Sequence, residues 1–237
     1  MLVKNFKKYL LVTFFIFKIG STAFAQGNLP YIDDRALHFG FSLGMNAMDF
    51  GIAPSNLDIN GKIYQADVSK LNPGFTVGII SDLRLSRYFS LRFTPTLHFG
   101  DRQINYTYVG STTTDSIFVS SIPVCVPLHI KYSAQRKGNY RPYLLWGGGA
   151  YFDLGRNKEN PTLLKPLGFY TEFGIGCDLY FSFFKMAPEL KFAIGLNDML
   201  TPLDQRDAGF LNDNDKKYTL ALSKLTAKMI TLSFNFE

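Results

Sequence analysis

Residues 121–132 read SIPVCVPLHIKY, and apolar side chains occupy every second position of this stretch. One set consists of Ile122, Val124, Val126, Leu128, Ile130 and Tyr132, and the other of Ser121, Pro123, Cys125, Pro127, His129 and Lys131. Successive side chains of a β-strand point to opposite faces. This period of two therefore predicts a strand with one apolar face and one mixed polar face.

The same alternation recurs along most of the chain. Apolar side chains keep to one face in residues 38–47, 75–84, 89–100, 169–181, 186–197 and 229–236. A further apolar segment, residues 141–154, is harder to phase because Gly147, Gly148 and Gly149 have no side chains. Together with residues 121–132, these segments predict an all-β fold of eight antiparallel strands.

The predicted connections alternate between long and short. The long ones are polar (residues 49–72, 101–116, 155–166 and 198–224), whereas those near Ser86, Gly138 and Lys185 are short. Outer-membrane barrels have this rhythm, with long loops outside, short turns in the periplasm and both chain ends on the periplasmic side. Strands of about 9–11 residues cross a bilayer when tilted, and there they must close on themselves. We therefore expect an eight-stranded transmembrane β-barrel whose apolar face meets lipid.

A soluble β-sandwich is the main alternative, because its strands alternate as well. The face opposite a sandwich core is mostly polar, whereas here that face is rich in glycine and small residues and carries charges at mid-strand. Such charges suit a narrow lumen, in which they can pair. The predicted lumen network consists of Arg92, Lys131, Glu172, Asp178, Glu189 and Lys191, with Asp82 and Arg84 as further candidates. We interpret it as a structural plug, since eight strands leave little room for the alternative, a gated solute path.

The N-terminus has the pattern of an export signal. Lysines precede an apolar run from Leu10 to Phe17, and Ala23-Phe24-Ala25 then supplies the small residues of a cleavage site. The run is too short to span a bilayer, which disfavours the alternative of a membrane anchor. We predict a cleaved signal peptide over residues 1–25 and a barrel domain over residues 26–237. The signal holds four lysines and no acid, so the mature chain carries 21 basic and 19 acidic residues. This balance gives little reason to expect a nucleic-acid partner.

Candidate reactive side chains are few. His38, His98 and His129 are predicted to face the lumen, whereas lipid-modifying barrels place their serine and histidine on the outer surface. We therefore expect no catalytic residue, no cofactor and no metal site. Cys125 is predicted to face the lumen and Cys177 the lipid, and opposed side chains cannot form a disulfide.

Aromatic residues near the predicted strand ends are typical of girdles at the two membrane interfaces. The candidates are Tyr88, Tyr132, Tyr140, Tyr143, Trp146, Tyr151 and Tyr180. The last strand contains Phe234 and Phe236, as barrel assembly requires, but Glu237 follows where an aromatic residue usually ends the chain.

Three stretches resemble the PorT family: EFGIGCD at residues 172–178, PELKF at residues 188–192 and GLND at residues 195–198. The signal, the length and the last strand are similar as well. PorT proteins belong to the type IX secretion system of the Bacteroidetes. The resemblance implies a non-enzymatic outer-membrane barrel needed to secrete cargo that carries a C-terminal sorting domain, such as proteases, adhesins and gliding-motility proteins. It also implies other secretion components and outer-membrane lipids as partners, and no small-molecule substrate.

Two other functions are compatible with the same pattern. An OmpA-like structural or adhesive barrel would bind an external partner through residues 49–72 and 198–224. A lipid-modifying hydrolase, which the orientation of the histidines disfavours, would act on lipid A or phospholipid.

Overall fold

The computed structural model describes residues 28–59, 61–68, 72–108, 110, 113–206 and 211–237, so the predicted signal peptide lies outside the described residues. The strands are β1 (Leu37–Pro54), β2 (Asp58–Ile59), β3 (Lys62–Val68), β4 (Asn72–Arg84), β5 (Phe89–Phe93), β6 (Thr96–Tyr108), β7 (Thr114–Ser121), β8 (Pro123–Ser133), β9 (Tyr140–Asp153), β10 (Leu167–Tyr180), β11 (Lys185–Gly195) and β12 (Leu222–Phe236). The short helices are η1 (Ile32–Asp34), η2 (Leu203–Gln205), η3 (Asp213–Asp215) and α2 (Lys216–Leu220). None of the helices in the described ranges is long and apolar enough to cross a membrane.

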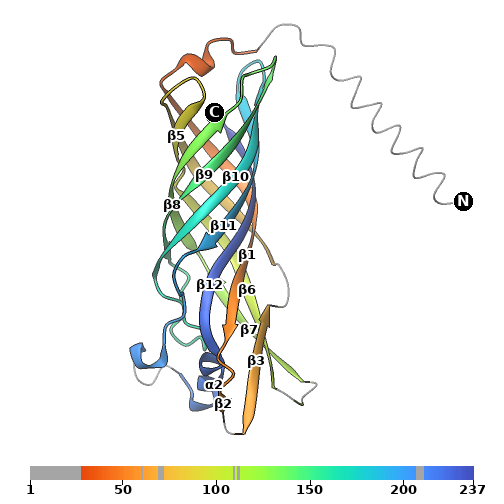
Figure 1. The fold of residues 1–237 in the computed structure, drawn as a ribbon, viewed down its shortest axis with the longest axis vertical. Coiled ribbons are helices and arrows are strands. Elements are labelled where there is room, and N and C mark those ends of the chain that lie inside the picture. Colours follow the sequence, from red (N-terminus) through yellow and green to blue (C-terminus); the bar gives the residue numbers. More distant parts are fainter. Residues whose placement is uncertain (1–27, 60, 69–71, 109, 111–112, 207–210) are drawn as a thin grey trace, which may run out of the picture.

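The strands close into a ring of eight antiparallel positions (Figure 1). The order around the ring is β1, β12, β11, β10, β9, β8, then β5 with β6, then β4, and back to β1. Strand β1 pairs along one edge with β12, from Phe41 opposite Phe236 onward, and along the other edge with β4, from Leu37 opposite Leu83 onward. Because the series of paired strands that starts at β1 returns to β1 through β4, the sheet is a closed barrel and not a sandwich.

Some ring positions contain two strands in succession. β5 and β6 form one position, interrupted at Thr94 and Pro95. Proline has no N–H to donate to a ladder, and here Pro95 contributes only its carbonyl, which accepts from the Ile79 N–H at 3.1 Å. β7 and β8 also follow one another along one position, and so do β3 and β4.

The two ends of the barrel differ. Residue 28 and Glu237 lie at one end, which we call the terminal end, together with the short turns at residues 85–88, 134–139 and 181–184. The long connections lie at the opposite end, which we call the loop end. The predicted positions of the three short turns are thus confirmed.

The middle of the barrel has an apolar outer face. Phe39, Ile79 and Trp146 are each more than 60% exposed, whereas the alternate residues Ser42 and Thr76 are buried inside. The predicted phase of β1, β4, β5, β6, β8, β10, β11 and β12 is confirmed. We call this outer zone of exposed apolar side chains the apolar belt.

The glycine run of β9 permits a close approach of β9 and β8. A Cβ added at Gly147 would lie 2.1 Å from the Leu128 carbonyl oxygen, and one added at Gly149 would lie 2.2 Å from that of Val126. The residues of β9 that face inward include Tyr143 and Tyr151, which are 3% and 5% exposed.

The girdle prediction is therefore wrong for Tyr143 and Tyr151, because the glycines conceal the phase of the strand. It is also wrong for Tyr180, which is 2% exposed and points into the barrel. Tyr88, Tyr132, Tyr140 and Trp146 do lie exposed on the outer face.

Residues 49–72 and 101–116 are not simply loops, as the sequence predicted, because strands continue through much of both ranges. β6 pairs with β7 from Gly100 opposite Ser121 to Thr107 opposite Thr114, and with β3 as well. Figure 1 shows this extension beyond the barrel, at the loop end.

The extension has the opposite polarity to the belt. Ile104, Tyr106 and Val119 are buried inside it, and the outward residues are polar apart from Phe118, which is exposed. Helix α2 adds Tyr218, whose ring centroid lies 4.9 Å from that of Tyr106. The polar outward residues made these strands resemble loops in the sequence.

A charge placed in the apolar belt should destabilise the barrel in lipid. We expect Ile175→Arg, on the outward face of β10, to lower the free energy of unfolding in lipid vesicles by about 2–4 kcal/mol. Thr107→Arg, on the polar extension, should change it by less than about 1 kcal/mol. The fluorescence of Trp146, the single tryptophan, would report unfolding in urea. Equal effects of the two variants would contradict a lipid-facing belt.

Candidate functional site: a closed, charged lumen

The six residues predicted to form the lumen network all lie inside the ring. Arg92, Lys131, Glu172, Asp178, Glu189 and Lys191 are each at most 4% exposed. They belong to β5, β8, β10 and β11, where the alternation that turns apolar residues outward turns these inward. A buried charge costs several kcal/mol unless it is paired. The partners of each group therefore decide what the lumen can do.

Arg92 is the centre of the network. Its guanidinium lies 2.9 Å from Asp82 Oδ2, 3.1 Å from Glu189 Oε2 and 3.0 Å from Glu237 Oε1. These carboxylates come from β4, β11 and the last residue of the chain. One side chain thus joins opposite parts of the barrel wall across the lumen.

Two lysines extend the network toward the terminal end. Lys131 Nζ lies 2.9 Å from Asp178 Oδ2, and Lys185 Nζ lies 2.6 Å from Glu237 Oε2. The Tyr143 hydroxyl donates to Glu189 Oε2 at 2.6 Å, and its ring lies under the Lys131 ammonium at 4.0 Å.

A third group lies further toward the loop end. Lys191 Nζ is 3.3 Å from Glu172 Oε1 and 3.8 Å from Glu189 Oε1, so it connects this group to Arg92. His129 Nε2 lies 2.9 Å from the same Glu172 oxygen. The ion pairs therefore form one continuous cluster through the lumen.

The histidines lie in different surroundings. His98 is held between two threonine hydroxyls, with Nδ1 2.8 Å from Thr76 and Nε2 3.0 Å from Thr96. His38 is half-buried at the terminal end. The structure does not bring the three histidines together. In the described part of the chain, no group of three or more His, Cys, Asp or Glu side chains is placed to hold a metal ion.

Sequence reasoning missed three members of the network. The sequence pattern places Lys185 near a turn and Tyr143 at the membrane interface, and it gives Glu237 no place in the lumen. The carboxylate of Glu237 reaches Arg92 and Lys185, and the backbone of Glu237 pairs with that of Lys185. Of the further candidates, Asp82 is in the network, whereas Arg84 lies at the rim and pairs with Asp34 at 3.2 Å.

The N-terminal residues 28–35 cover the terminal end of the barrel. The Asp33 carboxylate accepts a hydrogen bond from the Tyr180 hydroxyl at 2.8 Å. It also lies 3.5 Å from Arg136 and 3.6 Å from Arg141. Because Tyr180 and Arg141 lie at the ends of β10 and β9 and Arg136 lies in the turn between β8 and β9, residues 28–35 form a cap across the terminal end.

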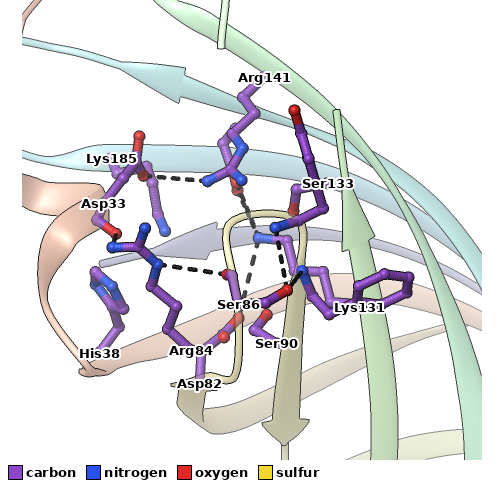
Figure 2. A pocket seen from close by; sticks show the side chains of 13 residues that line it. Asp33, His38, Asp82, Arg84, Ser86, Ser90, Lys131, Ser133, Arg141 and Lys185 are labelled. Carbon is purple, nitrogen blue, oxygen red and sulfur yellow. Dashed lines mark hydrogen bonds and ion pairs between the residues drawn. The ribbon is translucent and has the colours of Figure 1, made fainter. Parts of the chain in front are cut away.

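A small pocket remains between the cap and the ion-paired cluster (Figure 2). Its volume is about 30 Å³, and Asp33, Arg84, Lys131 and Lys185 are among the residues that line it. This space is on the scale of one or two water molecules. The cap and the ion pairs thus both lie across the terminal end of the lumen.

The loop-end half of the lumen is closed by apolar packing. Arg102 is buried there, with its guanidinium 4.7 Å from the Phe50 ring and 3.5 Å from the Ser121 hydroxyl. Cys125 is buried nearby, whereas Cys177 is half-buried on β10, and both are free thiols. A cavity of about 30 Å³ lies beside Arg102 and Cys125.

A closed ring of antiparallel strands with an apolar outer belt and a charged interior defines a class, the β-barrel membrane proteins. The chain belongs to the outer membrane protein beta-barrel domain family, whose model matches residues 24–201. It is accordingly an outer-membrane β-barrel protein.

Among solved structures, the chain is similar to the outer membrane protein OprG from Pseudomonas aeruginosa. The two are 11% identical, with 84% of this chain and 93% of that chain covered and a TM-score of 0.44. No curated protein matches the chain.

Removing Arg92 should leave buried carboxylates without the positive charge that pairs with them. We expect Arg92→Met to lower the free energy of unfolding by about 3–5 kcal/mol, since Asp82, Glu189 and Glu237 would lose their shared partner. Arg84→Met, which breaks a pair at the rim, should cost less than about 1 kcal/mol. Urea titration of the refolded barrel measures both. If Arg92→Met is no worse than Arg84→Met, the ion pairs are not what holds the lumen closed.

Proposed function

We propose that this protein is a non-enzymatic accessory barrel of type IX protein secretion, which acts through contacts with other proteins and not through its lumen. The observation that carries the proposal is the closed lumen. Arg92 and its three carboxylates bridge the wall, and residues 28–35 cover the terminal end. A path through the barrel would require several buried ion pairs to separate without new partners.

The secretion system itself is proposed from the resemblance of residues 172–178, 188–192 and 195–198 to the PorT family. Membership of the outer membrane protein beta-barrel domain family supports the coarser part of this proposal, the location in the outer membrane. An eight-stranded lumen is too narrow for a folded cargo protein. The barrel would therefore assist a separate translocon.

We propose that the terminal end faces the periplasm and the loop end faces outward. The short turns and both ends of the described chain lie together at the terminal end, as in bacterial outer-membrane barrels. The polar outer surface of the extension at the loop end suits water. The expected partners are other secretion components in the outer membrane and periplasm, together with outer-membrane lipids.

Deleting the gene in the source bacterium should trap cargo with a C-terminal sorting domain in the periplasm. Immunoblots of periplasm, cell surface and medium measure the distribution of one such cargo protein. A strain complemented with the wild-type gene is the control, and it should restore release. Normal release of cargo by the deletion strain would contradict the proposed role in secretion.

A surface-binding barrel is the second candidate, and the structured loop end favours it. A groove of about 600 Å³ lies there between Leu57, Asp198 and Leu220. Replacing residues 203–220 by a short turn should abolish surface binding without affecting cargo release if this candidate is right. Loss of cargo release with unchanged surface binding would instead favour the secretion role.

A further inference from the structure

The strand β7 has one paired edge and one open edge. It pairs with β6 along its whole length, and with no other strand of the described chain. The ladder between β8 and β9 ends at Pro123 opposite Asp153, and one further hydrogen bond joins the Leu154 N–H to the Ile122 carbonyl at 3.0 Å. Residues 155–166 belong to no strand. Strand β7 continues beyond this point, so the side that β9 would cover is left without a neighbouring strand.

The backbone groups at the open edge can be identified. The Phe118 carbonyl accepts a hydrogen bond from Asn160 Nδ2 at 2.8 Å, so it points away from β6. Alternate residues of a strand present their backbone groups to the same edge. The N–H groups of Ser116, Phe118 and Ser120 therefore face the open edge, together with the carbonyls of Ser116 and Ser120. None of these five groups has a backbone partner in the described residues.

Asn160 occupies the position of a missing strand. Its side-chain amide donates to Phe118 as the N–H of a neighbouring strand would. It satisfies one carbonyl and leaves the groups on either side available. An added strand would take the place of the Asn160 amide at this carbonyl.

Space for an added segment lies beside the edge. A cleft of about 270 Å³ is lined by Phe118 and Ser120 of β7 and by Arg156, Asn160 and Leu164 of the connection between β9 and β10. Phe118 itself is 60% exposed. An extended polypeptide can enter a cleft of this kind with its backbone against β7.

The residues of the edge itself offer little protection against pairing. Natural proteins block open edges with lysine, proline or a bulge, or cover them with a loop, and here the Asn160 side chain covers the Phe118 carbonyl. Residues 116–120 read SIFVS, which contains neither lysine nor proline, and Ile117, Phe118 and Val119 have high strand propensity. The register of β7 with β6 is continuous from Ser121 to Thr114, so no bulge turns the edge away.

We infer that the open edge of β7 binds an extended segment of another protein by strand addition. Main-chain hydrogen bonds would provide affinity, and Phe118 would provide an apolar contact. The inference rests on the proposed function, because it names the surface through which the barrel contacts a partner. A second copy of this chain is a poor occupant. Copies in one membrane run in the same direction along its normal, so their β7 strands cannot pair antiparallel about a twofold axis.

The first test places a photo-crosslinker at the edge in living cells. Benzoylphenylalanine in place of Phe118 should give an adduct with one partner protein. Ser116→Pro should abolish the adduct, because proline removes an outward N–H but no hydrogen bond to β6. Ser116→Ala is the matched control, since it also loses the hydrogen bond from the Ser116 hydroxyl to Asn105 and keeps the N–H. It should retain the adduct.

The second test uses a synthetic peptide with the sequence of the crosslinked segment. Added to the purified barrel in detergent, it should slow amide exchange at Ser116, Phe118 and Ser120. Exchange at Ile117 and Val119, which already pair with β6, should not change. Ser116→Pro should weaken peptide binding by about tenfold or more, and Ser116→Ala by less than about twofold.

The outcomes separate this inference from the secretion role. An adduct that survives Ser116→Pro, an adduct between two copies of the chain, or no adduct at Phe118 would overturn the strand-addition site. If the deletion strain traps cargo but the adduct at Phe118 is absent or survives Ser116→Pro, the secretion role stands and the edge site fails. If the adduct and the exchange pattern are found but deletion does not affect cargo, the edge site stands and the secretion role fails.

Discussion

Closure of the ring by β1 is the constraint on which the rest of the structure depends. β1 pairs with β12 along one edge and with β4 along the other, so the described part of the ring has no open edge in the belt. Hydrocarbon offers no hydrogen bonds, and an unpaired N–H or carbonyl there costs several kcal/mol. An open sheet with the same apolar outer face could not enter a membrane. Closure also separates the two faces of every strand into one that meets lipid and one that does not.

The interior follows from that separation. Eight strands enclose a space that side chains alone fill, and charges within it are out of reach of bulk water. Arg92 therefore lies among Asp82, Glu189 and Glu237, and Lys185 shares the last of these. The same contacts that stabilise the charges close the lumen. A lumen closed in this way leaves the outer surfaces, among them the extension at the loop end, for contacts with other molecules.

The alternation of apolar and polar side chains continues along the same strands from the belt into the extension, but the apolar face turns from the outside to the inside. In the belt, Phe75 on β4 is 53% exposed on the outside and Thr76 is buried inside. In the extension, Ile104 and Tyr106 are buried inside, and Gln103 and Asn105 face outward. The reversal marks the level at which the surroundings change from lipid to water. Beyond that level an open edge has water as an alternative partner, which is why β7 can extend past β9 without a neighbouring strand.

The sequence by itself determined the strands of the belt, their lipid-facing sides and the inward direction of Arg92, Lys131, Glu172, Asp178, Glu189 and Lys191. Each of these follows from a local period of two, which needs no knowledge of distant residues. Only the tertiary structure decided which charges meet, that Glu237 completes the cluster, that residues 28–35 form the cap and that Tyr143 turns inward. Those results depend on how strands far apart in the chain pair with one another. At β9 they also depend on three glycines, which have no side chains to show which face is which. Alternation places a side chain on a face, but ring closure decides what lies opposite to it.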